Sequence, residues 1–177
     1  MRSVFMRYPG GKPKALTFSY DDGNVHDRRL AGIFDKYGMK ATFNFCGKCM
    51  GENYTAEEMK EIFLSKGHEI AVHGESHRAN GNMRPIDGIR DVLNCRLELE
   101  AKCGRIIRGM AYPDTGITLM GNADGYSQIK QYLTELDIAY ARTLGGDNNR
   151  FLLPEDFHAW VPTAHHKNPK IMEYINE

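Results

Sequence analysis

Two histidines lie four residues apart in the run His73-Gly74-Glu75-Ser76-His77. On a helix or in a tight turn, this spacing places both imidazoles on one face, close enough to share a metal ion. The pattern alone is weak, because two of the seven histidines can lie close together by chance and be solvated. His73 and His77 are therefore candidate metal ligands that need a third donor.

Two adjacent carboxylates, Asp21 and Asp22, follow an apolar run and precede Gly23. Adjacent carboxylates repel each other unless a cation or hydrogen bonds offset the cost. A plain strand followed by an Asp-Gly turn is the alternative. Consecutive side chains point in different directions, so one carboxylate can complete a three-ligand metal site with an open water position. The other can then accept the water's proton, which is the division of roles that metal-assisted hydrolysis requires.

A third segment runs from Ile107 to Pro113. An arginine near the middle of a strand, here Arg108, could pair with a buried carboxylate. Tyr112 precedes a proline and is therefore held extended. Its backbone N–H could point at the site and stabilise an oxyanion. Taken alone, this stretch is typical of an ordinary strand and turn.

The elements that must position these residues alternate between short apolar strands and amphipathic helices. The patterns predict strands over 15–20, 41–45, 69–73, 106–112 and 138–142, helices over 26–37, 85–102 and 126–136, and a helix that a capping box opens at Thr55. Weaker signals favour strands over 151–154 and 160–163 and a last helix over 169–175. Such alternation indicates five or six βα units and a parallel sheet. The candidate residues would then meet at the carboxyl ends of the strands.

The composition limits the functions that this protein can have. The 177 residues fit one domain over the whole chain, 1–177, and 23 basic residues balance 23 acidic ones. Because nucleic-acid binding usually needs a basic excess, nucleic acid is not an expected partner. No apolar run approaches a membrane span and the N-terminus lacks a signal-peptide pattern, so we expect a cytoplasmic protein. The four cysteines read as reduced thiols, although Cys46 and Cys49 could also be half a zinc site or a redox pair.

Together these segments resemble the polysaccharide deacetylase family, the carbohydrate esterases of family four. The first family motif, T-F-D-D-G, is similar to residues 17–23 with two residues inserted before the aspartates. The second, H-[ST]-x-x-H, is matched by His73 and His77, with Gly74 at the [ST] position. The resemblance implies that Asp21 is the catalytic base and that Asp22 joins both histidines as a metal ligand.

The third family motif contains an arginine, a proline and a tyrosine before a glycine. Arg108, Tyr112 and Pro113 match it loosely, and Asp114 and Thr115 replace the usual residues. By the resemblance, Arg108 would orient the base and the Tyr112 N–H would contribute to the oxyanion hole. The resemblance extends from about Arg7 to the end of the chain.

The resemblance implies an α/β fold, a distorted (β/α) barrel with fewer than eight units. Because the late strand signals are weak and the family's late histidine has no clear match, we expect the barrel to be incomplete at its C-terminus. It also implies removal of acetyl groups from an acetylated sugar or polysaccharide, such as N-acetylglucosamine polymers or xylan esters. Two imidazoles and a carboxylate suit zinc as the divalent metal, and cobalt, manganese, nickel or iron would fit the same donors.

One departure concerns the general acid, which the family places on a late strand as a histidine. The late candidates here are His158, His165 and His166, and Pro162 interrupts a regular strand just before the last two. Either the acid is missing, with His165 and His166 a surface pair, or one of these two histidines supplies it.

Two rival functions remain: another metal-dependent amidohydrolase with a small substrate, or an inactive metal-bearing fragment that binds glycan. An open sheet edge would also make oligomers possible.

Overall fold

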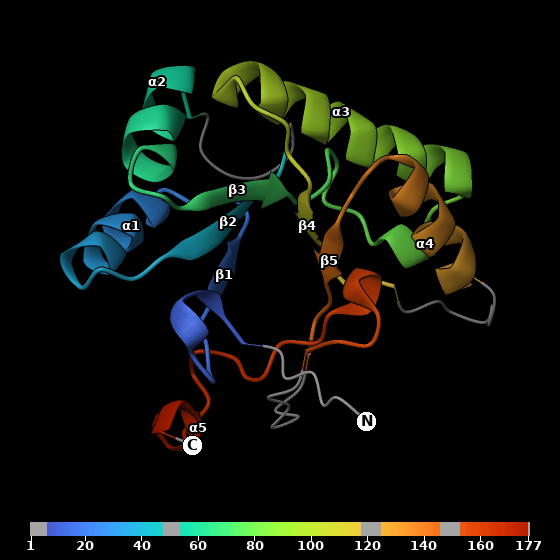
Figure 1. Cartoon of the computed structure of the whole chain (residues 1–177). Helices are drawn as coiled ribbons and strands as arrows, with labels where there is room; N and C mark the ends of the chain where they lie inside the picture. The colour runs from blue at the N-terminus through green and yellow to red at the C-terminus, as the bar shows by residue number, and fades with distance from the viewer. Residues whose placement is uncertain (1–6, 48–53, 118–124, 146–152, 177) are drawn as a thin grey trace.

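The computed structural model describes residues 7–47, 54–117, 125–145 and 153–176. Its centre is a sheet of five parallel strands that lie side by side in the order of the sequence (Figure 1). The strands are β1 (Phe18–Asp21), β2 (Ala41–Phe45), β3 (Glu69–Val72), β4 (Gly109–Ala111) and β5 (Tyr140–Arg142). A parallel sheet whose strands follow chain order is the arrangement of a singly wound barrel, in which each helix returns over the same face.

The helices between the strands lie on one side of this sheet (Figure 1). They are α1 (Asp27–Lys36), α2 (Ala56–Glu58) with its continuation η2 (Met59–Leu64), α3 (Pro85–Cys103) and α4 (Gly125–Glu135). The predicted capping box opens α2: the Thr55 hydroxyl accepts from the Glu58 N–H at 3.1 Å, and the Glu58 carboxylate accepts from the Thr55 N–H at 2.9 Å. The cap fixes where this helix begins because it pairs two N–H groups that lack helical partners.

The hydrophobic core fills the layer between the sheet and these helices. Outward-facing strand residues such as Phe43, Val72 and Met110 have no exposed surface. They pack with helix residues such as Phe63 and Leu133 in one continuous cluster. Because strand side chains alternate between faces, the other set of strand residues faces the concave side, and that side is where polar residues gather.

The sheet curls strongly across its width. β1 and β5 are the two outermost strands, and in a flat sheet four strand spacings would separate them by roughly 19 Å. Yet the Arg142 guanidinium on β5 contacts the Asp21 carboxylate on β1. The strands therefore form a curled half-barrel, which confirms the expected distorted (β/α) barrel with fewer than eight units.

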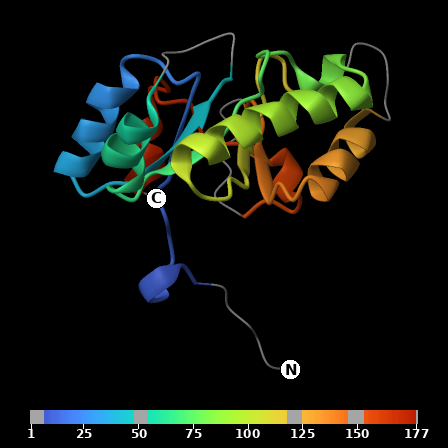
Figure 2. The same ribbon diagram turned by 90° about the horizontal axis from the view of Figure 1, so that it is seen from above.

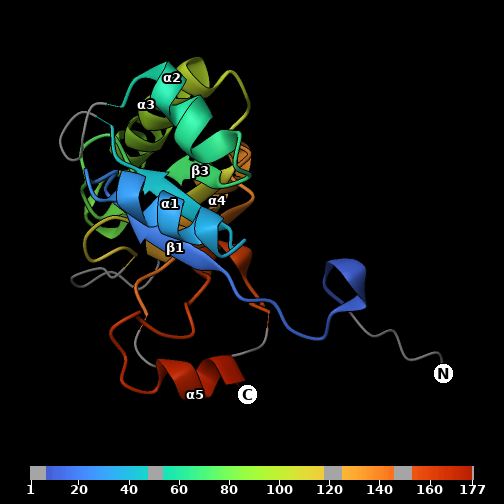
Figure 3. The ribbon, with the colours of Figure 1, turned by 90° about the vertical axis from the view of Figure 1, so that its left-hand side faces the viewer.

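The chain after β5 crosses the open side of the half-barrel. Trp160 extends the sheet by a single parallel bridge to Arg142, after the short helix η4 (Phe157–Ala159). The chain then reaches β1, where the His166 ring stacks on Tyr20 with centroids 5.7 Å apart. It ends in α5 (Ile171–Asn176), below β1 in Figure 3. The predicted strand over 160–163 is thus reduced to one bridged residue, because Pro162 has no N–H to continue a ladder. Residues 151 and 152 of the predicted strand over 151–154 lie outside the described residues.

At the other end of the chain, the short helix η1 (Pro9–Gly11) projects away from the sheet and its helices (Figure 2). Within the described residues, no helix is both long enough and apolar enough to cross a membrane.

Candidate metal centre and active site

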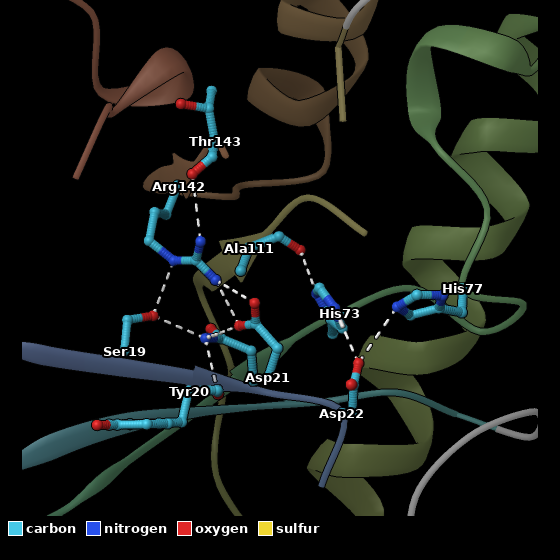
Figure 4. Close-up of polar contacts among 10 residues, drawn as sticks. Ser19, Tyr20, Asp21, Asp22, His73, His77, Ala111, Arg142 and Thr143 are labelled. Atoms are coloured by element: carbon cyan, nitrogen blue, oxygen red, sulfur yellow. Dashed lines mark hydrogen bonds and ion pairs between the residues drawn. The ribbon is translucent and has the colours of Figure 1, made fainter. Parts of the chain in front are cut away.

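The candidate residues meet at the carboxyl edge of the sheet, as the strand pattern predicts. Asp21 is the last residue of β1 and Asp22 follows it, while His73 follows the last residue of β3. His77 lies four residues farther along the loop. Figure 4 shows both imidazoles pointing at the Asp22 carboxylate.

The distances within this trio fit a shared metal ion. The Nε2 atoms of His73 and His77 lie 3.3 Å and 3.2 Å from Asp22 Oδ1. Two ligand atoms of a tetrahedral zinc ion lie roughly 3.4 Å apart, given metal–ligand distances of about 2.0–2.1 Å. Despite this proximity, Oδ1 is a buried oxygen without a well-aligned hydrogen bond. The three ligand atoms all lie within 4.8 Å of one another, close enough to share one ion.

The orientation of His73 leaves its Nε2 lone pair available. His73 is buried, and its Nδ1 lies 2.8 Å from the Ala111 carbonyl oxygen. A carbonyl can only accept, so Nδ1 carries a hydrogen and donates it, and in the neutral imidazole Nε2 is then the nitrogen with the lone pair that a metal can use. Such a backbone contact is the usual way in which a ligating histidine is fixed in one tautomer.

The pKa of the Asp22 carboxyl also agrees with a role as a metal ligand. The His73 imidazole has the largest effect and lowers the pKa of the Asp22 carboxyl, with His77 adding to the effect and burial opposing it. The Asp22 carboxyl is therefore ionised, as a metal ligand must be. Among the residues that the structure describes, this trio is the only group of three or more such side chains close enough to hold an ion.

Two of the three candidate ligands adopt a backbone conformation that L-residues rarely take. Asp22 has a φ of 78° and His77 a φ of 51°. Positive φ costs free energy for residues with a Cβ, and such strain persists where the surroundings hold it in place. The two strained residues are the ones that turn their side chains toward His73.

The loop that carries the histidines is held by Asp91 on α3. The Asp91 carboxylate accepts from the backbone N–H groups of Glu75 at 3.1 Å and Ser76 at 2.8 Å, and from the Ser76 hydroxyl. Gly74 permits this approach: its φ is 76°, and a Cβ there would lie 2.6 Å from Asp91 Oδ2. The departure at Gly74 from the family motif therefore has a structural reason, and the Ser76 hydroxyl contacts the carboxylate that anchors the loop.

Asp21 lies beside the trio and is held by a separate set of contacts on the concave face (Figure 4). Nη2 of Arg142 contacts both Asp21 oxygens, at 2.5 Å for Oδ2, and Arg142 Nε donates to the Ser19 hydroxyl at 3.0 Å. The buried Asn44 on β2 donates to Asp21 Oδ1 at 2.9 Å and to the Ser19 hydroxyl at 2.8 Å. These contacts orient the carboxylate, as a general base requires.

The prediction that Arg108 orients the base is wrong. Arg108 lies just before β4, where its side chain is 55% exposed and pairs with Asp137 at 2.5 Å. Arg142 occupies the expected position instead. It ends the last predicted strand, so the rule that site residues gather at strand ends could have found it.

The prediction for Tyr112 fails at the donor group. Its backbone N–H donates to the Arg142 carbonyl at 2.9 Å, continuing the pairing of β4 with β5, so it does not face the site. The Tyr112 hydroxyl is buried and donates to the His158 carbonyl at 2.7 Å. Tyr112 therefore ties β4 to the segment after β5.

The late histidines lie away from the trio. His158 Nε2 lies 2.6 Å from the Ile138 carbonyl and so donates to it. His165 and His166 are exposed. Tyr20, on which His166 stacks, also contacts Phe34 of α1 and thus lies on the opposite face of β1 from Asp21. This arrangement agrees with the interpretation of His165 and His166 as a surface pair.

One further carboxyl near the site was not singled out from the sequence. Asp27, at the start of α1, is only 5% exposed, and its Oδ2 has no hydrogen-bond partner in the described part of the chain. Burial, reinforced by the charges of Asp22 and Asp21, raises the pKa of Asp27 from 3.8 to about 7, against a backbone hydrogen bond from Asn24. In the sequence, Asp27 looks like an ordinary acidic residue in the first turn of a helix.

The fold and the site together define a half-barrel of βα units in which three candidate metal ligands converge and the Asp21 carboxylate lies beside them. The family model for polysaccharide deacetylase matches residues 6–136. The chain belongs to the polysaccharide deacetylase family. Among curated proteins, none matches the sequence.

Solved structures with a similar fold include three from this family. A deacetylase from Streptococcus pyogenes, PplD, in complex with acetate, is 18% identical with a TM-score of 0.65, over 87% of this chain and 66% of that one. A family 4 acetyl xylan esterase from Clostridium thermocellum, in complex with cobalt, is 19% identical with a TM-score of 0.53, over 74% and 58%. A CE4 family pseudoenzyme from Bacillus anthracis is 15% identical with a TM-score of 0.55, over 73% and 43%. At these identities the likeness shows the fold, and the chain spans less than two thirds of each relative.

Proposed function

We propose that this protein is a metal-dependent hydrolase that removes acetyl groups from N-acetylated or O-acetylated carbohydrate. The observation that carries the proposal is the convergence of Asp22, His73 and His77 with a separately held carboxylate, Asp21, beside them. Membership of the polysaccharide deacetylase family supports the substrate class.

The residues divide the chemistry between them. Asp22, His73 and His77 would hold a divalent ion, for which zinc suits two imidazoles and one carboxylate, and cobalt, manganese, nickel or iron also fit. When bound, such an ion supplies Lewis acidity that polarises an acyl oxygen and makes water easier to deprotonate. Asp21 accepts the proton of the attacking water, and Arg142 and Asn44 keep its carboxylate oriented for that transfer.

Acetate release from an acetylated substrate tests the proposal. Purified protein with measured metal content would be offered N-acetylglucosamine oligomers, acetylated xylan and small acetamides. We expect turnover on the carbohydrates and a loss of roughly 10²–10⁴-fold in the Asp21→Asn variant with its metal retained, because only the proton acceptor is removed. His77→Ala should lose the metal itself, since two ligands rarely hold a divalent ion tightly. Full metal content in His77→Ala would show that the ligand set is wrong.

A second candidate is a metal-bearing protein that binds glycan without turnover. The positions of His158, His165 and His166, away from the trio, favour it, because no late histidine is placed to protonate a leaving amine. A similar fold also occurs in a pseudoenzyme. Stoichiometric metal with no acetate released from any carbohydrate would support this candidate, whereas turnover on small acetamides alone would indicate a different amidohydrolase.

A further inference from the structure

A cavity of about 470 Å³ lies outside the metal centre, between η3 (Asn80–Asn82), the start of α3 and the first turns of α4. It opens on the same edge of the sheet as the trio, because η3 belongs to the loop that follows β3 and carries His77. His77 and Asn80 are three positions apart, so their Cα atoms lie within about 11 Å of each other. A ligand that extended from the metal centre along this loop would reach the cavity.

The lining combines apolar surface with neutral amides. Met83 and Ile129 contribute apolar side chains, and Asn80, Asn82 and Gln128 contribute amides that can both donate and accept. The described part of the lining contains no carboxylate and no lysine. Its one charged residue, Arg84, is already paired with Asp87, with Nε 2.8 Å from Oδ2. The cavity therefore suits a neutral ligand with an apolar surface and a polar rim.

One wall of the cavity is a buried polar pair with spare hydrogen-bonding capacity. Asn80 is 1% exposed, and its Nδ2 donates to the Tyr132 hydroxyl at 3.0 Å. Asn80 Oδ1 has no partner among the described residues. Gly88 allows the Tyr132 ring to lie close to α3, since a Cβ at this position would lie 2.6 Å from the Tyr132 oxygen. A buried amide oxygen without a partner is costly, so this pair gives the wall behind the cavity a polar character that an apolar filling would not offset.

We propose that this cavity binds a neutral sugar unit of the carbohydrate chain, next to the unit from which acetyl is removed. A pyranose ring presents C–H groups on its faces and hydroxyl or acetamido groups at its rim, which matches the apolar and amide parts of the lining. An anionic ligand would need a free cation, and Arg84 is engaged by Asp87. The inference rests on the proposed function, because it takes the metal centre as the place of reaction.

The test compares two glutamines on α4. Gln128 lines the cavity, whereas Gln131 lies outside the described lining and bonds Glu135 one turn farther along. Both are exposed and neither touches the trio or Asp21. The substrates are a tetrasaccharide and the matching monosaccharide, from N-acetylglucosamine or acetylated xylose, whichever releases acetate faster. We expect Gln128→Ala to raise KM for the tetrasaccharide about three- to tenfold and to leave the monosaccharide unchanged, while Gln131→Ala changes neither.

Binding to the metal-free protein gives a readout that does not depend on turnover. Both tetrasaccharides would be titrated into wild type, Gln128→Ala and Gln131→Ala by calorimetry, with Asn82→Ala as a second variant of the lining. Weaker binding in the two lining variants alone supports the inference, even if the proposed reaction fails. Equal tetrasaccharide affinity and KM in all four proteins would overturn it, as would a tetrasaccharide that binds no better than its monosaccharide, and acetate release would then still support the proposed function.

Discussion

At the scale of single residues, the guanidinium of Arg142 is the group that separates this site from a generic pair of carboxylates. Its Nη2 contacts both oxygens of Asp21 and its Nε donates to the Ser19 hydroxyl, so it holds the carboxylate in place. An ammonium group in its place would be a point charge with less control of orientation.

We therefore expect Arg142→Ala to lower kcat by roughly 10–100-fold while metal content and KM stay close to wild type. Arg142→Lys should recover part of the loss, because it restores the charge without the fork. Arg108→Ala is the matched control, since that arginine is exposed and pairs only with Asp137 in the described part of the chain. Equal losses in Arg142→Ala and Arg108→Ala would contradict the assignment of Arg142 to the base.

Asp27 predicts a pH dependence of stability. Its pKa is raised to about 7 in the folded chain, mainly by burial, so the folded state holds this proton more tightly than the unfolded state does. The resulting stabilisation is fully present below the unfolded pKa of about 4 and is lost as pH rises through about 7, at up to about 1.4 kcal/mol per pH unit.

The Asp27→Asn variant removes this titration. In chelator-treated protein, its free energy of unfolding relative to wild type should rise between pH 4.5 and 7.5 by on the order of 2 kcal/mol, measured by urea denaturation. Asp137→Asn, which changes an exposed aspartate, is the control. Wild-type and Asp27→Asn curves that stay parallel across this range would show that the Asp27 proton is not linked to folding.

At the scale of elements, the candidate metal centre depends on a strand end, a loop and a helix that supplies none of its three candidate ligands. β3 delivers His73, the loop delivers His77, and α3 supplies Asp91, which accepts the loop's N–H groups. Without that carboxylate, the N–H groups of Glu75 and Ser76 would lose a buried acceptor, and the left-handed backbone at His77 would lose its support.

Asp91→Ala should weaken affinity for cobalt or zinc by roughly 10–100-fold in a chelator competition titration. Gly74→Ala should do the same, because its Cβ would meet the Asp91 carboxylate at 2.6 Å. Glu98→Ala, on the same helix but paired with Lys102, should bind metal as wild type does. If both loop variants kept wild-type affinity while folding normally, the anchoring role of Asp91 would be rejected.

At the scale of the whole molecule, side chains and one chain segment, rather than further strands, close the half-barrel on one side within the part of the chain that the structure describes. Arg142 reaches Asp21 from one sheet edge to the other, and residues 160–166 run from β5 to β1. This segment carries His165 and His166 to the outer face of β1, where they are exposed.

The double variant His165→Ala/His166→Ala tests whether either histidine is the general acid. The leaving group of an aryl ester is a phenoxide, which needs protonation much less than the amine that leaves an amide. The protein should therefore hydrolyse aryl acetates relatively better than N-acetylglucosamine oligomers. We expect the double variant to keep the wild-type turnover of aryl acetates and the wild-type activity on the sugar amide. A large drop in sugar-amide deacetylation from a robust wild-type rate would show that one of these histidines moves in to protonate the amine.

The sequence by itself determined the order and type of the main helices and the five strands, although several strand ends differ from those predicted. Apolar runs of period two and helical runs with caps are local signals, so β2 and the start of α2 were predicted to the residue. That Asp22, His73 and His77 come together could be predicted for the same reason, because each lies just beyond a strand end and a parallel sheet brings such ends to one edge.

Only the tertiary structure decided what supports these residues. Arg142 and Asp21 are 121 positions apart, and they meet because five short strands curl far enough to bring the first strand opposite the fifth. Likewise, the Tyr112 N–H donates to the Arg142 carbonyl on β5. Asp91 reaches the loop that carries the histidines only because α3 packs on the sheet. A sequence pattern records the faces of each element, whereas the curl of a sheet results from twist and packing summed over all its strands, which no local pattern contains.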